Sequence, residues 1–574
     1  MKNLIYTLWA LLFLILCYSA NAQDQQGNSG GILSGNLEAN ANFFMRDTLI
    51  GAEGTPQYDR QLFGGESWLN LNYSNWGFEF GLRFDVYNNS FLPNPLDSYT
   101  DEGIGRWFVK KKIHKLGITV GYIYDQIGSG IIFRAYEERP LFIDNALFGL
   151  QLTYDLSPDW QIKGFTGRQK NRFDTYESVL KGGSIEGFIS SGESANWSMA
   201  PGLGVVGKTL SDEAYTQLQN TVANYLPQDT FNLQYNSYAF TLYNNLTIGN
   251  LNWYVEGAYK IGDIYFNQFA TRLTRTEGGV KEVEGKYANN DGSVMYTSLS
   301  WATKGFGASV EAKQTENFNF RANPFVSLNQ GFINFLPPMT RINTYRLTSR
   351  YNAATQEIGE QSIQADITYA PTRKLSFNVN FSNITDLGNV KKDQGKTLLY
   401  RELYTEVQYK YKRKWSLIAG VQMQRYNQEI FEEKPEVPIV ETFTPYFDFL
   451  YKIDRKKAIR FESQYMMIGD DIKADSKQDY GSWLFGLVEF TVAPHWTFTI
   501  SDMYNIDPGK QSPSDANGEK IDVHYPRFDI YYTNKSNRFS LSYVKQVEGV
   551  VCSGGICRLE PAFSGVKMTV NSSF

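Results

Sequence analysis

Apolar and polar residues alternate in many short segments of this chain, up to the phenylalanine that ends it. Residues 78–86 read FEFGLRFDV, residues 375–381 read LSFNVNF, and residues 568–571 read MTVN. Because successive side chains of a β-strand point to opposite faces, each segment predicts a strand with one apolar and one polar face. Repetition of such strands without a long apolar helix is typical of a transmembrane β-barrel.

Short polar turns recur between these segments, and several are followed by a tryptophan: Trp76, Trp160, Trp253, Trp415 and Trp496. Counting about ten such hairpins, and adding an opening strand near residues 35–45 and a closing strand at 566–574, predicts about 22 strands. The predicted fold is thus an all-β, antiparallel up-and-down transmembrane barrel, with a range of about 18 to 24 strands. Bacterial barrels turn tightly in the periplasm, so both termini are expected there, with the tryptophans in an interfacial girdle.

Long connections alternate with the short turns and are expected outside the membrane or inside the barrel. The large ones are predicted at residues 88–103, 125–146, 171–236, 262–292 and 317–357. No separate plug domain fits ahead of the first strand, so a lumen of this width must hold folded-in loops, a partner or water.

The first 22 residues are predicted to be a signal peptide, and residues 23–574 one barrel domain. Lys2 precedes an apolar stretch from Leu4 to Tyr18, and Ala20-Asn21-Ala22 fits a cleavage site. A lipoprotein is the alternative for Cys17, but Leu16 is not the small residue that a lipobox requires. Aromatic residues make up 15% of the chain and its net charge is −5, which argues against a nucleic-acid partner.

Two other cysteines, Cys552 and Cys557, flank a Ser-Gly-Gly-Ile turn. In an exported protein they are predicted to form a local disulfide, and two free thiols are the alternative. The chain has three histidines and none lies close to the cysteines, so no metal site and no other cofactor is expected.

The connection at 125–146 combines large apolar residues with a group of charges. The charged residues are Arg134, Glu137, Glu138, Arg139 and Asp144. One interpretation is a constriction of the lumen, where facing charges screen solutes. The alternative is a packed outer loop with ordinary surface ion pairs. A second apolar connection, at 323–339, either folds inward beside it or presents a patch to a partner.

Residues 202–209, GLGVVGKT, match the nucleotide-binding pattern GxxxxGK[ST]. Such loops follow a buried strand and open a helix inside a βαβ unit, and no such pattern surrounds this one. We therefore expect a glycine-rich loop that leads into a short helix, capped by Ser211 and ended before Pro227. The chain lacks a GxSxG nucleophile motif, and we expect no enzymatic activity.

Three segments resemble an uncharacterised family of Bacteroidota outer-membrane barrels, classified as a domain of unknown function. They are GSGIIFRAYEER at 128–139, NQG at 329–331 with LPP at 336–338, and the ending from Cys552 to Phe574. The resemblance implies the barrel fold over nearly the whole mature chain, and it implies no activity or functional residues. The terminal aromatic looks like the signal read by the barrel-assembly machinery.

These patterns predict a protein of the outer membrane, in contact with its lipid. The first functional hypothesis is a pore for small solutes whose lumen is narrowed by inward loops. The alternative is a structural or assembly subunit of an export or surface machine, which binds other outer-membrane proteins through its loops or its periplasmic turns.

Overall fold

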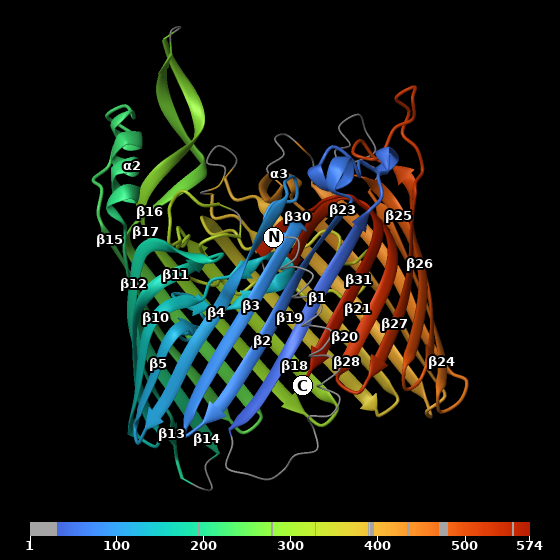
Figure 1. Ribbon diagram of the computed structural model, residues 1–574, viewed down its shortest axis with the longest axis horizontal. Coiled ribbons are helices and arrows are strands. Elements are labelled where there is room, and N and C mark those ends of the chain that lie inside the picture. Colours follow the sequence, from blue (N-terminus) through green and yellow to red (C-terminus); the bar gives the residue numbers. More distant parts are fainter. Residues whose placement is uncertain are drawn as a thin grey trace, which may run out of the picture.

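The protein forms one closed antiparallel β-barrel, seen in a computed structural model (Figure 1). The structure describes residues 31–192, 196–276, 279–327, 329–388, 390, 395–432, 437, 439–469, 480–553 and 556–574. Within these residues 24 strands make up the barrel wall. The predicted architecture is therefore confirmed, and the strand number is two above the predicted 22.

The wall strands follow one another in chain order, each paired with its sequence neighbours. They are β1 (Ile32–Phe44), β2 (Phe63–Asn75), β3 (Phe78–Ser90), β4 (Tyr99–Ile113), β5 (Leu116–Ile123), β10 (Leu147–Ser157), β11 (Trp160–Asn171), β12 (Asp174–Gly187), β14 (Trp197–Thr209), β15 (Asn236–Ile248), β16 (Leu251–Thr276), β17 (Gly279–Thr303), β18 (Phe306–Glu316), β19 (Gly359–Thr372), β20 (Leu375–Thr385), β21 (Leu398–Tyr411), β22 (Trp415–Tyr426), β23 (Val440–Lys452), β24 (Lys457–Ile468), β25 (Gly481–Val492), β26 (Trp496–Pro508), β27 (His524–Asn534), β28 (Asn537–Gln546) and β31 (Phe563–Ser573).

The barrel closes where β1 pairs with β31, in register from Asn36 opposite Ser573 to Phe44 opposite Gly565. Gly35 and Phe574 exchange two backbone hydrogen bonds, of 2.9 and 3.0 Å, beyond the end of this ladder. The described start of the chain and its C-terminus therefore lie together, at the end of the barrel that carries the short turns. The signal peptide predicted for residues 1–22 lies outside the described residues.

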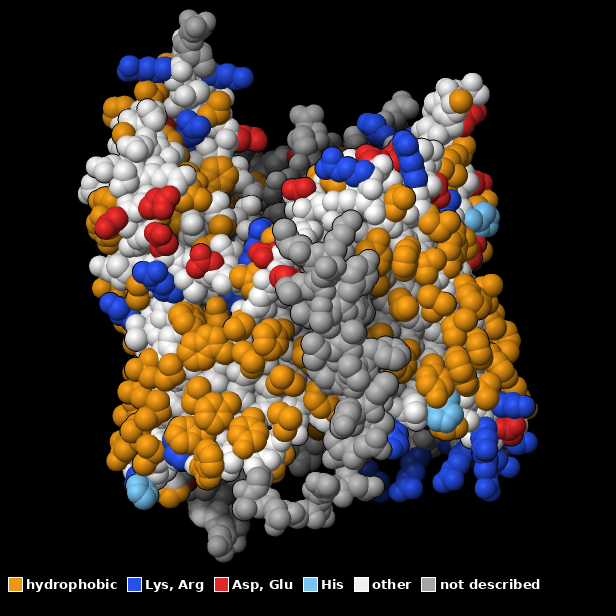
Figure 2. All heavy atoms as spheres, viewed as in Figure 1, with side chains coloured by type: hydrophobic (Ala, Val, Ile, Leu, Met, Phe, Trp, Pro, Cys, Tyr) orange, Lys and Arg blue, Asp and Glu red, His pale blue; other side chains and the backbone are white. Residues whose placement is uncertain are grey.

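Alternation along each strand sorts the side chains between the two faces of the wall. On β15, Tyr238, Phe240 and Leu242 are exposed, whereas the intervening Ala239 and Thr241 are buried. The exposed apolar residues form a broad band around the lower half of the visible face (Figure 2). Such a band is the surface that a barrel presents to lipid.

The predicted tryptophans all lie beside short turns, as the girdle interpretation requires. Trp253 and Trp496 are 44% and 42% exposed, and Trp76 is 79% exposed. Their amphipathic rings suit the boundary between hydrocarbon and water.

Two of the predicted long connections are wrong, and the first of them accounts for the two extra strands. Residues 171–236 contain the wall strands β12 and β14, which are joined near the short-turn end, and only the part after Thr209 is a loop. Residues 262–292 are not a loop, because β16 and β17 continue as one paired hairpin up to Thr276 opposite Gly279. The hairpin and helix α2 (Asp212–Ala223) rise together beyond the barrel rim (Figure 1).

The helix prediction after Thr209 is confirmed. Ser211 caps α2 by accepting a hydrogen bond from the Ala214 amide, at 3.2 Å. Smaller elements occur in the connections: β6 (Asp125–Gln126), β7 (Arg134–Ala135), β8 (Glu137–Glu138), β9 (Ile143–Asp144), β13 (Ile189–Ser190), α3 (Gln428–Phe431), β29 (Gly549–Ser553), β30 (Ile556–Glu560), and the single turns Thr48–Ile50, Gln57–Gln61 and Arg139–Leu141.

Candidate functional site: the barrel lumen

The connection at 125–146 folds into the barrel and is held there by charges on the inner wall. Arg83 on β3 donates to Glu137 at 2.6 Å and to Asp144 at 2.7 Å, and it is also paired with Asp85 on its own strand. Lys170 on β11 is a further partner of Asp144. Burial raises the pKa of Asp144, but Lys170 and Arg83 oppose this and hold it below the ordinary value. The carboxylate therefore stays ionised and ties the loop to two wall strands.

The other predicted charges of this loop also lie inside the barrel. Arg139 pairs with Glu137 at 2.8 Å and with Glu38 of β1 at 2.5 Å. The Arg134 guanidinium lies 4.1 Å from the centre of the Phe335 ring. Glu138 sits in the short β8–β9 pair, opposite Ile143. A narrow cavity of about 70 Å³ is lined by Glu137, Arg139 and Asp144 among others.

The long connection at 317–358 lies beside this loop, as one of the two alternatives for residues 323–339 predicted. Its backbone pairs with the first loop: Arg134 donates to the carbonyl of Ile333, and Phe335 donates to that of Gly130, both at 2.9 Å. Apolar side chains of both loops share one core, including Ile131, Phe320 and others. The two loops together fill one side of the lumen.

A buried ionic triad anchors the second loop to the wall. Asp263 on β16 pairs with Lys208 of β14 at 2.5 Å and with Lys260 at 2.6 Å, and all three side chains are at most 1% exposed. Each ammonium also donates to a loop carbonyl, Lys208 to Arg321 at 3.0 Å and Lys260 to Asn319 at 2.5 Å. Asp263 thus neutralises part of the charge of the two lysines, and the lysines hold the loop through its carbonyl groups.

These anchors explain the sequence that resembled a nucleotide-binding loop. Residues 202–209 lie on β14, so the predicted glycine-rich loop is wrong, and Lys208 is a member of the triad rather than a phosphate ligand. Gly204 faces the lumen, and a Cβ there would lie 2.4 Å from the side chain of Ile127. Glycine is required because the inward loop passes directly over the strand.

The opposite side of the lumen is hollow. One cavity of about 720 Å³ lies toward the long-loop end, where Glu432, Tyr480 and Gln511 are among its lining residues. A second cavity of about 530 Å³ runs along the inner faces of β25, β26, β27 and β28. It reaches Thr533 and Arg538, beside the turn that joins β27 to β28.

The two cavities adjoin one another. Arg346, Met503 and Gln546 line both of them. Arg346 belongs to the inward loop, whereas Met503 and Gln546 belong to β26 and β28. The boundary between the cavities therefore lies between a loop residue and the barrel wall.

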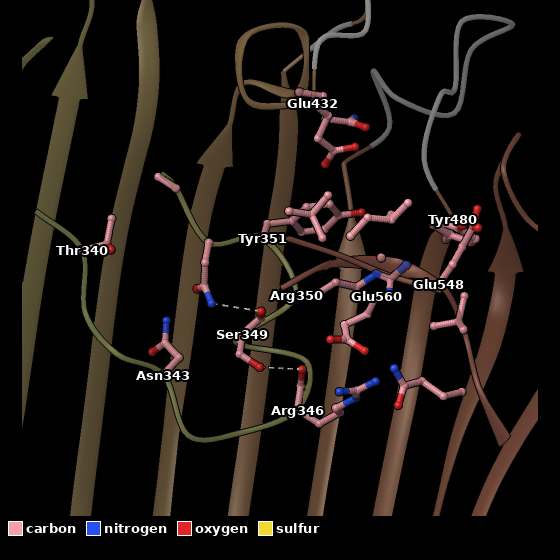
Figure 3. Close-up of a pocket in the computed structure, with 18 of the residues that line it drawn as sticks. Thr340, Asn343, Arg346, Ser349, Arg350, Tyr351, Glu432, Tyr480, Glu548 and Glu560 are labelled. Atoms are coloured by element: carbon pink, nitrogen blue, oxygen red, sulfur yellow. Dashed lines mark hydrogen bonds between the residues drawn. The ribbon is translucent and has the colours of Figure 1, made fainter. Parts of the chain in front are cut away.

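Hydrogen bonds to wall side chains hold the segment around Arg346, whose loop passes in front of the wall strands in Figure 3. Gln464 of β24 accepts from the Leu347 amide at 2.7 Å, and Gln422 of β22 donates to the Thr348 carbonyl at 2.9 Å. Within the segment, Ser349 donates to the carbonyl of Arg346 at 3.1 Å. These bonds fix the backbone while leaving the Arg346 side chain in the cavities.

A second inward element is the β29–β30 hairpin, in the connection between β28 and the closing strand β31. Arg558 from this hairpin donates to the carbonyls of Leu92 and Pro140, at 3.3 and 3.1 Å, across the barrel mouth. Cys552 and Cys557 are direct cross-strand partners in its ladder. Their disulfide remains a prediction.

In the part of the chain that the structure describes, no helix is long and apolar enough to cross a membrane. The same residues contain no group of three or more histidine, cysteine, aspartate and glutamate side chains arranged to hold a metal ion.

The family model of DUF6029, a family of unknown function, matches residues 1–574. The chain belongs to this family. The predicted likeness to an uncharacterised domain family is thereby confirmed. No curated protein matches the chain significantly.

Several solved barrels are similar in structure at very low sequence identity. The P pilus usher (PapC) translocation pore has a TM-score of 0.43 and 10% identity, over 94% of this chain and 99% of its own. A mutant ferric enterobactin receptor (PfeA) from Pseudomonas aeruginosa has a TM-score of 0.41 and 8% identity, over 96% and 81%. OccK5 (OpdH) from Pseudomonas aeruginosa has a TM-score of 0.34 and 13% identity, over 69% and 93%. None of these similarities is strong enough to indicate a function.

No pattern in the sequence indicated Arg346 or the adjoining cavities. The sequence predicted only the filled side of the lumen, from the apolar residues of the two inward loops. A single arginine among polar loop residues matches no sequence motif. Arg346 is notable only because the folded chain places it opposite wall strands that line the same cavities.

Proposed function

We propose that this protein is a pore for small solutes in the outer membrane, and that its route runs past Arg346. The observation that supports it is a pair of adjoining cavities, one along the inner faces of β25–β28 and one toward the long-loop end. The lining includes hydroxyl and charged side chains such as Thr499, Ser501 and Asp529, which suit hydrated solutes. The apolar outer band supports the membrane location and contact with lipid.

In this proposal the two inward loops reduce a wide barrel to a narrow side passage. The predicted constriction residues Arg134, Glu137, Glu138, Arg139 and Asp144 narrow the lumen by keeping one loop in place. The Arg346 segment forms the neck of the route that remains. The short-turn end faces the periplasm, and assembly into the membrane uses the barrel-assembly machinery.

Single-channel recording of the purified protein in planar bilayers tests the proposal. We expect discrete conductance steps from the wild-type protein, and larger steps when residues 340–352 are replaced by a short Gly-Ser linker. Absence of conductance from both proteins, each shown to be folded and inserted, would refute the pore.

An assembly role is the second candidate, favoured by one feature. Helix α2 and the β16–β17 hairpin project beyond the rim, where they contribute nothing to the wall (Figure 1). Removing residues 264–288 tests this role. Loss of co-purifying outer-membrane proteins with unchanged conductance would support it, and a barrel that purifies alone before and after the deletion would oppose it.

A further inference from the structure

The neck between the two cavities carries arginine side chains that no carboxylate of the described residues pairs with. Among the described residues, no carboxylate pairs with Arg346 or Arg350, and the Arg346 side chain forms no hydrogen bond there. The Arg346 side chain is exposed, and the surface it exposes faces the two cavities. Figure 3 shows both arginines on the same loop segment, facing the lumen.

Nearby carboxylates already have partners of their own. Glu560 pairs with Arg558 at 3.0 Å, and Asp529 pairs with Arg527 at 2.8 Å. Glu548 accepts a hydrogen bond from the Tyr480 hydroxyl at 2.7 Å. Two of these acids thus have arginine partners of their own, and the third accepts from a tyrosine hydroxyl. Glu560 also acts on Arg346 electrostatically, but Arg350 and Arg527 act on it more strongly with like charge.

Arg350 is held by aromatic rings instead of an acid. Its guanidinium lies 4.8 Å from the ring centres of both Tyr480 and Trp483. Stacking of this kind orients a guanidinium without neutralising it. Lys567 on β31 adds a further cation within electrostatic reach of Arg346, its ammonium 4.1 Å from the Phe563 ring centre.

The pKa of Arg346 is lowered first by its position in the barrel interior and then by neighbouring like charge. Burial in the barrel interior, together with Arg350 and Arg527, lowers the pKa of Arg346 to about 10. The guanidinium is still fully charged at neutral pH. A positive group that its surroundings disfavour is stabilised by any anion that enters the neck.

We propose that the Arg346 neck is an anion-binding site, which selects small solutes bearing carboxylate or phosphate groups. The geometry favours such groups because a guanidinium presents its donors as a planar fork that matches two oxygens of one anion. The inference deepens the proposed pore and rests on it. Chloride should pass more readily than potassium, and polyvalent anions should bind at the neck.

The reversal potential in asymmetric potassium chloride measures this preference. At about 7 Å in water, one positive charge lowers the energy of a passing chloride ion by about RT and raises that of a potassium ion by the same amount. Each permeability then changes roughly threefold, in opposite directions, so the chloride-to-potassium ratio changes roughly sevenfold. We expect Arg346→Gln to lower the chloride-to-potassium ratio by about this factor, and Arg346→Glu to lower it further. Arg346→Lys, which keeps the charge, should retain most of the preference.

Arg275 provides a matched control, because it is an exposed arginine on the hairpin outside the barrel. Arg275→Gln should leave the ratio unchanged. Inorganic phosphate should block chloride current through the wild-type pore and much less through Arg346→Gln. Current without anion preference, or a preference and phosphate block that survive Arg346→Gln, would overturn the inference and leave the pore standing. Absence of any current would instead refute the pore itself.

Discussion

Replacing Asp263 by asparagine should release the long inward loop from the wall. The substitution removes the only carboxylate between Lys208 and Lys260 in the described structure, and both lysines are at most 1% exposed. Breaking a buried ion pair by removing one partner costs about 3–5 kcal/mol, because the remaining charge is left uncompensated. The asparagine oxygen and the two loop carbonyls still accept hydrogen bonds, so we expect the lower end of this range.

Hydrogen exchange of backbone amides within residues 317–358 measures this release. About 3 kcal/mol corresponds to at least ~100-fold faster exchange where opening limits it. Useful reporters are Ala322 and Ile333, whose amides donate to Gly331 and Phe320 at 2.8 and 2.9 Å. Asp155→Asn is the control, because Asp155 pairs with the exposed Lys112 and accepts from Gln161 at the short-turn end of β10, and no change is expected there.

A second variant tests whether Asp263→Asn releases the loop through its uncompensated lysine charges or through lost packing. Replacing the triad together, Lys208→Met with Lys260→Met and Asp263→Leu, leaves no unpaired charge and should recover much of the protection. Equal exchange rates in wild type and Asp263→Asn would refute the anchoring role. So would a triple variant that opens the loop more than Asp263→Asn does.

Further predictions concern the other loop, the lipid face and the cysteines. Gly204→Leu places a side chain against Ile127 and should increase protease cleavage within residues 125–146, whereas Gly307→Leu, where no atom lies within 4 Å of the added Cβ, should not. Leu242→Arg, on the lipid side of β15, should destabilise the folded barrel by about 2–4 kcal/mol in urea titrations from lipid bilayers, and Leu242→Met should not. Cys552 and Cys557 should react with maleimide only after reduction, and labelling of the unreduced protein would contradict the predicted disulfide.

The wall could be predicted because lipid and strand geometry impose the same rule on every strand. The alternation of apolar and polar residues predicted which side chains face outward. The tight turns followed by tryptophan predicted which end of the barrel carries the short turns. The prediction of strands failed where residues that face the lumen depart from the alternation of apolar and polar side chains. On β14, Gly204 leaves room for the folded loop and Gly202 leaves room for the Tyr243 ring of β15, so the strand looked like a loop. On β16–β17 the strands simply continue beyond the barrel rim, where apolar alternation is no longer required.

The lumen was predictable only in part. The apolar residues of 125–146 indicated an inward loop, and its charges were recognised as a group. Their partners were not recognisable, because Arg83 and Lys170 come from distant strands whose inward polar residues are typical of any barrel. The open route could not be predicted from the sequence at all, because it is the space that the two inward loops leave unfilled.

Blocking the proposed route with one side chain tests the central claim most directly. Ser501 faces the second cavity and is 7% exposed, while its neighbour Ile500 faces outward and is 59% exposed. Single-channel recording of Ser501→Trp should show a strongly reduced conductance, and Ile500→Trp should conduct like the wild type. Equal conductance in all three proteins would contradict a route along β25–β28.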